Sequence, residues 1–222
     1  MLICESFLLV KLEKSKHRKS IALGSEAIAC LAGAGIMDLI LGGKLILEEK
    51  RLKLLDTDPT GVDFLDKILT IIKESKKIRK LKRWIIEFSS KGCLDLDNLV
   101  FISLENQGIL QFEMRVTARI FYKWIYNFTK PEIIQSLLER IQNAFIDDNV
   151  DPEIALLCLY PLIQINRLFG FCFSKEYRNM VKYRNEQLLL FGNYDPSHIE
   201  MIKSVKKAIK SVLSAADAFY LP

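Results

Sequence analysis

The chain has 222 residues, of which 50% are hydrophobic and 27% are charged, and its 32 Lys and Arg residues against 27 Asp and Glu residues give a formal net charge of +5. This composition is typical of a globular protein with a sizeable core and excludes a disordered or low-complexity chain. The longest stretch without a charge, Ile154–Asn166, is shorter than the roughly 20 residues of a membrane-spanning helix and contains Pro161. We therefore predict no transmembrane helix.

Few residue patterns suit catalysis or metal binding. The five cysteines lie far apart, and the chain has only two histidines, His17 and His198. This pattern does not favour a disulfide framework, a zinc site or imidazole-based catalysis. No glycine-rich phosphate-binding motif occurs, and the N-terminus lacks the basic region of a signal peptide. The sequence predicts a cytoplasmic protein that is not an enzyme and has no metal or cofactor.

Helical spacing of apolar residues dominates the chain and predicts a mainly α, single compact helical domain over residues 1–222. The first helix is expected at Leu2–Leu12. A buried central helix follows, with Ser25 as its N-cap and Gly42-Gly43 at its end. Further helices are expected at Val62–Ser75, Ile78–Phe88, Leu96–Gln107, Pro131–Phe145, Pro152–Arg167, Lys175–Phe191 and Pro196–Tyr220.

Two small β-hairpins interrupt the helices. The first is predicted from Leu45–Leu47 and Leu52–Leu55, and the second from Ile109–Met114 and Ile120–Ile125 with a polar tip at Arg115–Arg119. A helix followed by a hairpin is also the local pattern of a winged-helix nucleic-acid binder. The helix in question has no Lys or Arg to read base edges, so nucleic acid is the weaker alternative.

A basic run at residues 73–83 carries seven positive charges in eleven residues, opposed locally only by Glu74. Such a run attracts polyanions such as anionic lipid head groups or nucleic-acid phosphates. The alternative is a solvated helix face with no ligand. The candidate anion-binding residues are Lys76, Lys77, Arg79, Lys80, Lys82 and Arg83.

The second hairpin mixes aromatic and basic residues, a combination that suits the interface of a membrane. The alternative is that every second residue packs on the helical core. The candidate lipid-binding residues are Arg115, Arg119, Ile120, Phe121, Lys123 and Trp124.

Five spaced motifs recur in order along the chain. They are ESFLLVKL (Glu5–Leu12), AGAGIMDLILGGKL (Ala32–Leu45), PTG (Pro59–Gly61) with Leu65-Asp66, KLKRWI (Lys80–Ile85) and QGIL (Gln107–Leu110). Together, in register from about Leu2 to Leu213, they resemble the Golgi phosphoprotein 3 family of peripheral membrane proteins. One departure is Val62-Asp63 after Pro59-Thr60-Gly61, where the family usually places the acid directly after the glycine.

The resemblance implies a mainly helical, non-catalytic protein that docks on membranes through phosphatidylinositol 4-phosphate and, in eukaryotes, retains glycosyltransferases in the Golgi. The family's lipid pocket uses a Trp, an Arg and two further basic residues. The aligned positions here are Leu23, Ala32, Leu94 and Asp97. None of these side chains donates charged hydrogen bonds to a phosphate, so the family's pocket is not expected to work here.

The chain begins directly at its first predicted helix, so we expect it to be nearest to the short, tail-less prokaryotic members and not to act as a coat adaptor. We predict a peripheral membrane protein on the cytosolic face of a membrane, which binds anionic or phosphoinositide lipid and recruits cytosolic tails of membrane proteins. A protein-interaction scaffold without lipid affinity is the other alternative. The resemblance also leaves open a homo-oligomer whose subunits pack or exchange the second hairpin.

Overall fold

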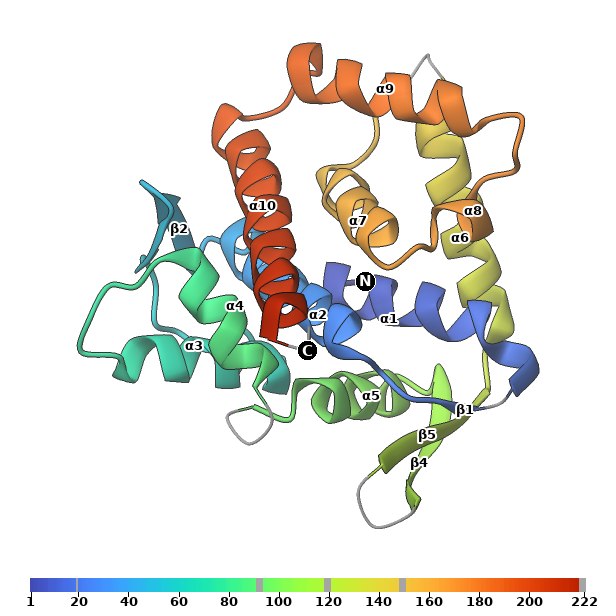
Figure 1. The fold of residues 1–222 in the computed structure, drawn as a ribbon, viewed down its shortest axis with the longest axis horizontal. Helices are drawn as coiled ribbons and strands as arrows, with labels where there is room; N and C mark the ends of the chain where they lie inside the picture. Colours follow the sequence, from blue (N-terminus) through green and yellow to red (C-terminus); the bar gives the residue numbers. More distant parts are fainter. Residues whose placement is uncertain (19, 91–93, 118–120, 148–150, 220–222) are drawn as a thin grey trace.

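The computed structural model describes the chain except for residues 19, 91–93, 118–120, 148–150 and 220–222. The described part is compact and mainly α, with ten α-helices and two small antiparallel sheets (Figure 1). The predicted fold class is confirmed.

The helices cover most of the chain, and the strands form one two-stranded and one three-stranded sheet. The helices are α1 (Ile3–Lys14), α2 (Ser25–Leu41), α3 (Asp63–Glu74), α4 (Leu81–Ser89), α5 (Leu96–Asn106), α6 (Pro131–Ile146), α7 (Ile154–Ile165), α8 (Phe169–Cys172), α9 (Arg178–Phe191) and α10 (Pro196–Phe219). The strands are β1 (Ser20–Ile21), β2 (Leu45–Glu48), β3 (Arg51–Leu54), β4 (Leu110–Thr117) and β5 (Phe121–Phe128).

Three local predictions differ from the structure. Gly24, not Ser25, is the N-cap of α2, and no side chain caps that helix. The second hairpin is longer than predicted, so Arg115 lies within β4 and not in a turn. The sequence pattern also missed β1 and α8, because two and four residues are too few to show a periodicity.

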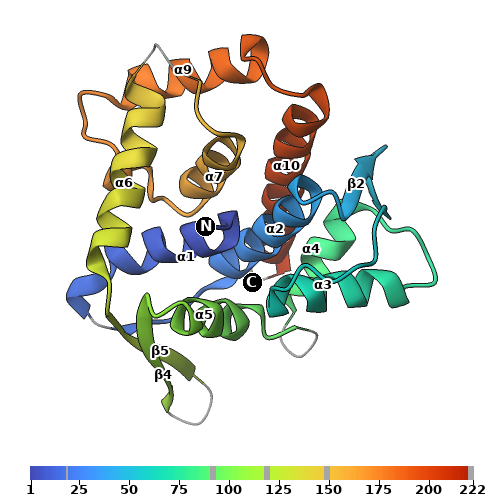
Figure 2. The ribbon, with the colours of Figure 1, turned by 180° about the vertical axis from the view of Figure 1, so that it is seen from behind.

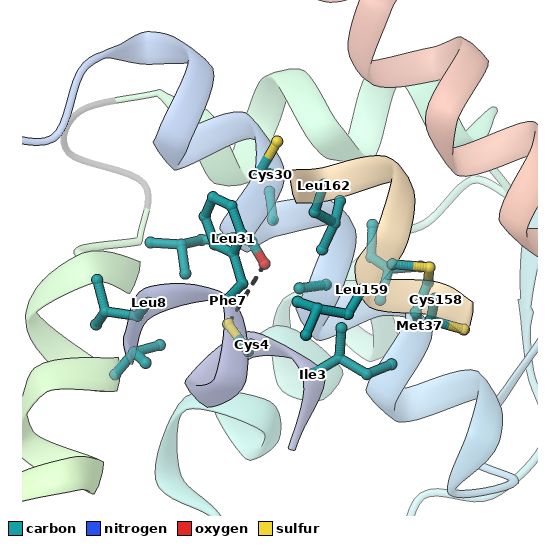
Figure 3. Close-up of a cluster of buried hydrophobic side chains, with 14 of the residues drawn as sticks. Ile3, Cys4, Phe7, Leu8, Cys30, Leu31, Met37, Cys158, Leu159 and Leu162 are labelled. Carbon is teal, nitrogen blue, oxygen red and sulfur yellow. Dashed lines mark hydrogen bonds between the residues drawn. The ribbon is translucent and has the colours of Figure 1, made fainter. Parts of the chain in front are cut away.

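The central helix α2 packs against α1, α3, α4, α7 and α10. Its glycines permit this close approach: a Cβ atom at Gly33 would lie 2.7 Å from Cδ1 of Ile209 in α10, and one at Gly35 would lie 2.7 Å from Cδ1 of Ile68 in α3. Figure 3 shows the apolar contact of α2 with α1 and α7, where the Cys4 thiol donates a hydrogen bond to the carbonyl oxygen of Leu31 at 3.5 Å. The prediction of a buried central helix is confirmed.

The N-terminus of α1 is buried and is capped from another helix. Its N-cap residue, Leu2, has no side-chain acceptor, and the carboxylate of Asp38 in α2 accepts hydrogen bonds from the amides of Ile3 at 2.9 Å and Cys4 at 3.0 Å. Glu5 accepts from the Leu2 amide and from Ser103 of α5. Two carboxylates therefore satisfy amide donors that would otherwise be left unpaired in the core.

The two-residue turn of the β2–β3 hairpin offers a test of local backbone strain. Glu49 and Lys50 have φ angles of 48° and 62°, a left-handed conformation that favours Asn and Gly. Replacing Glu49 with Asn and Lys50 with Gly is expected to raise the free energy of unfolding by about 1 kcal/mol. Urea denaturation of the double variant measures this, and an unchanged midpoint would contradict it.

Candidate functional site: a basic surface

The connector between α3 and α4 is held by the β2–β3 hairpin. The Leu52 amide donates a hydrogen bond to the Arg79 carbonyl at 3.2 Å, and the Leu81 amide donates to the Lys50 carbonyl at 2.8 Å. The guanidinium of Arg51 donates to the Ile78 carbonyl at 3.1 Å. Lys50 and Arg51 at the turn of the hairpin, which follow Glu48 and Glu49 in the chain, are thereby fixed beside the basic run of the connector.

This contact gathers six exposed cations, which we call the basic surface. In the part of the chain that the structure describes, none of them forms an ion pair. Ile78 lies among them in the sequence and is 54% exposed. The six residues are Lys50, Arg51, Lys76, Lys77, Lys80 and Arg83.

Two of the predicted cations have structural contacts instead. The guanidinium of Arg79 pairs with Glu87 at 2.7 Å and lies 4.9 Å from the ring centroid of Trp84. The half-buried Lys82 donates to the Ser211 hydroxyl of α10 at 2.8 Å. Their charges are therefore less available to a ligand than those of the other four predicted residues.

Lys50 and Arg51 were missed by the sequence reasoning. They precede the basic run by more than twenty residues and come beside it only because Arg51 bridges Lys80 in antiparallel register. The charged segment between the two predicted strands was visible in the sequence, but nothing in it indicated where the hairpin would dock.

The strand register places the candidate residues of the second hairpin in different environments, some buried and some exposed. Trp124 pairs with Met114 and stacks on Phe101 of α5, with ring centroids 4.6 Å apart, and it is only 2% exposed. The prediction that this ring lies at a membrane surface is therefore wrong. The alternative, in which alternate hairpin residues pack on the core, describes Trp124 correctly.

Two cations of that hairpin are exposed and lie directly opposite each other, Arg115 in β4 and Lys123 in β5. Arg115 is also paired with Glu113 at 3.1 Å, so part of its charge is compensated. Phe121 pairs in register with Thr117. Arg119 and Ile120 lie outside the described residues.

The four positions aligned with the family's lipid pocket provide no phosphate-binding group. Ala32 is fully buried, and Leu94 is 8% exposed. The carboxylate of Asp97 accepts a hydrogen bond from Trp124 Nε1 at 3.3 Å, and its pKa is raised by burial and by the neighbouring Asp95. An acid in this place does not favour an anionic head group.

No group of three or more His, Cys, Asp or Glu residues that could hold a metal occurs within the described ranges. The described cysteines, Cys4, Cys30, Cys158 and Cys172, are all buried, and burial raises the pKa of each thiol. Such thiols are poor nucleophiles. Across the same residues, no helix is both long and apolar enough to span a membrane.

Comparison with models of protein families identifies the family of this chain. The family model described as Golgi phosphoprotein 3 (GPP34) matches residues 3–193, a range that contains α1 to α9 and all of the basic surface. No curated protein matched the sequence. Because the family model covers most of the chain, this protein belongs to the Golgi phosphoprotein 3 family.

Proposed function

We propose that this protein is a non-enzymatic peripheral membrane protein that binds anionic lipid head groups through the basic surface, on the cytosolic face of a membrane. The observation that carries the proposal is the gathering of six exposed cations from two separate segments, around a connector that also exposes Ile78. Lys and Arg near an anionic membrane contribute about 1 kcal/mol each. Several of them together supply enough attraction for reversible binding.

The proposed contact is electrostatic, with shallow insertion of one apolar side chain. Ile78 is exposed and lies between Lys77 and Arg79 in the chain. In the proposed complex its side chain inserts into the bilayer when the ammonium groups of Lys76, Lys77 and Lys80 approach phosphates. Insertion of an aliphatic side chain adds a contribution that salt does not screen. The proposed binding therefore has a salt-sensitive and a salt-resistant part.

The proposal gives no stereospecific pocket for phosphatidylinositol 4-phosphate. The aligned pocket positions are apolar or acidic, as described above. The exposed cations lie along the connector between α3 and α4 and at the turn of the β2–β3 hairpin. Affinity is therefore expected to follow the surface charge density of the bilayer. A phosphoinositide is bound because of its high charge and not because of its pattern of phosphates.

Co-sedimentation with vesicles tests the proposed function. The protein is mixed at low ionic strength with vesicles of phosphatidylcholine alone, of phosphatidylcholine with phosphatidylserine, and of phosphatidylcholine with phosphatidylinositol 4-phosphate. We expect binding to both anionic compositions, matched for charge, and much weaker binding to the neutral vesicles. Absence of binding to anionic vesicles, or equal binding to neutral ones, would overturn the proposal.

The β4–β5 hairpin is proposed as a secondary contact. Replacing Arg115 and Lys123 with Ala is expected to weaken binding to phosphatidylserine vesicles by only about fivefold, because Glu113 already compensates Arg115. The slope of affinity against salt should also become shallower. An effect larger than that of substitutions in the basic surface would make the hairpin the principal contact and contradict this ranking.

Recruitment of membrane-protein tails is a second candidate function, favoured by an open groove beside the N-terminus of α1. The groove has a volume of about 600 Å³, and its apolar lining includes Leu2, Val62, Leu99 and Ile102. Pull-downs with cytosolic-tail peptides test it, with Ile102→Lys as the variant expected to lose binding. Equal capture by this variant and the unmodified protein would rule out the groove.

A further inference from the structure

Helix α9 packs on the rest of the protein through one face. Val181, Asn185 and Leu188 are buried on that face, at helical spacing. The preceding segment anchors the helix, since the guanidinium of Arg178 donates to the carbonyl oxygens of Phe173 at 3.1 Å and Gly170 at 3.0 Å. Its orientation on the surface is therefore fixed.

The opposite face of α9 exposes a second apolar stripe. Tyr183 is 64% exposed, Leu190 is 65% exposed and Phe191 is 78% exposed. Met180 and Gln187 are half-buried and lie on the same side of the helix. Positions 180, 183, 187 and 190 follow the 3-4-3 spacing of a coiled-coil seam, so this face has the pattern of a helix that packs on another helix.

We propose that the outer stripe of α9 docks on the same stripe of a second copy of this chain, to form an antiparallel two-fold homodimer. In a two-fold interface the same surface patch meets itself. Antiparallel pairing centred near residue 185 places Met180 against Leu190 of the second copy and Tyr183 against Gln187 of the second copy. Each half-buried residue then covers one that is now exposed.

The exposed area fits a weak dimer. Taking about 200 Å² as the surface of an aromatic side chain, the exposed parts of Tyr183, Leu190 and Phe191 amount to about 400 Å² per copy. Two copies bury about 800 Å² of these side chains together with a surrounding rim, an area in the range of weak, transient interfaces below about 1,200 Å². Association that depends on protein concentration in the micromolar range is expected, and a permanent dimer is not.

The position of α9 leaves the proposed membrane contacts uncovered. In both views α9 runs along one edge of the molecule, at the opposite end from the β4–β5 hairpin (Figures 1 and 2). The second copy would therefore add a second hairpin and a second basic surface without blocking the first. The proposed dimer contact uses only residues of α9, so the dimer proposal does not depend on lipid binding.

Sedimentation velocity over a concentration series tests the dimer in the absence of lipid. The full chain is compared with Leu190→Glu and with Leu55→Glu, a matched control because Leu55 is 60% exposed and directly follows β3. We expect a concentration-dependent dimer for the unmodified protein and the control. Because the substitution occurs twice in a two-fold interface, Leu190→Glu is expected to lower the association constant at least a hundredfold.

A disulfide exchange experiment tests the antiparallel pairing directly. Both variants carry Cys93→Ser, so that the remaining native cysteines are buried. Under mild oxidation, an equimolar mixture of the Tyr183→Cys and Gln187→Cys variants should give mainly the mixed cross-linked dimer, since these positions face each other across the two-fold axis. A protein that stays monomeric at all concentrations overturns the proposal. So does a dimer that Leu190→Glu leaves intact, because such a dimer uses another face.

Discussion

Replacing Lys76, Lys77 and Lys80 with Gln is expected to lower the affinity for anionic vesicles by about a hundredfold. Each cation contributes about 1 kcal/mol near an anionic surface, and three such contributions correspond to two orders of magnitude in the dissociation constant. All three side chains are exposed and, among the described residues, form no ion pair, so the free energy of unfolding should change by less than about 0.5 kcal/mol. Vesicle co-sedimentation at low ionic strength measures the loss.

A matched variant separates the position of the charges from their number. Three other exposed lysines lie outside the connector. They are Lys67 in α3, Lys175 before α9 and Lys182 in α9. Replacing these three with Gln lowers the net charge from +5 to +2, the same change as in the first variant. This control is expected to lose less than fivefold in affinity. Equal losses for the two variants would show that net charge alone attracts the membrane.

Replacing Asp38 with Ala is expected to lower the free energy of unfolding by about 3 kcal/mol. The carboxylate is 8% exposed and satisfies the amides of Ile3 and Cys4, which no other acceptor among the described residues reaches. Leaving two buried amide donors unpaired costs about 1–3 kcal/mol for each. Urea denaturation measures the change, with the exposed Asp58→Ala as a control expected to lose less than about 0.5 kcal/mol.

The pH dependence of stability gives Asp38 a second signature. Burial, the largest influence, raises the pKa of Asp38 from 3.8 to about 7. Between about pH 4 and pH 7 the folded protein therefore holds a proton that the unfolded chain releases, so the contribution of Asp38 to stability decreases as the pH rises. Asp38→Asn cannot ionise and should lack this decrease. Parallel stability curves for the two proteins over this range would contradict the assignment.

Much of the fold was predictable because the chain buries long helices with regular apolar spacing. Phe64, Ile68 and Ile72 define the inner face of α3, and Ile134, Leu137 and Ile141 define that of α6. Short elements were missed, since β1 exists only because Ser20 and Ile21 pair with β5. A tertiary contact of this kind leaves no local pattern in the sequence.

The site was predictable only in part, for the same reason. The basic run at residues 73–83 could be identified in the sequence. The sequence did not show that Arg79 would be paired with Glu87 or that Arg51 would lie beside Lys80. Trp124 was predicted to lie at a membrane surface because it is aromatic and has basic residues near it in the sequence. The strand register places it on the buried face against Phe101, because alternate residues of β5 face the core.

The most direct test of the proposed membrane contact is to measure which surface of the bound protein touches the bilayer. A fluorophore is attached to Ile78→Cys in a Cys93→Ser background, where the four remaining cysteines are buried, and vesicles carry a nitroxide-labelled lipid. Tyr177→Cys at the N-cap of α9 serves as the exposed control, since Tyr177 is 41% exposed and lies outside the proposed dimer stripe. We expect strong quenching at position 78 on anionic vesicles and little at position 177. Quenching at 177 without quenching at 78 would contradict the assignment of the basic surface as the membrane contact.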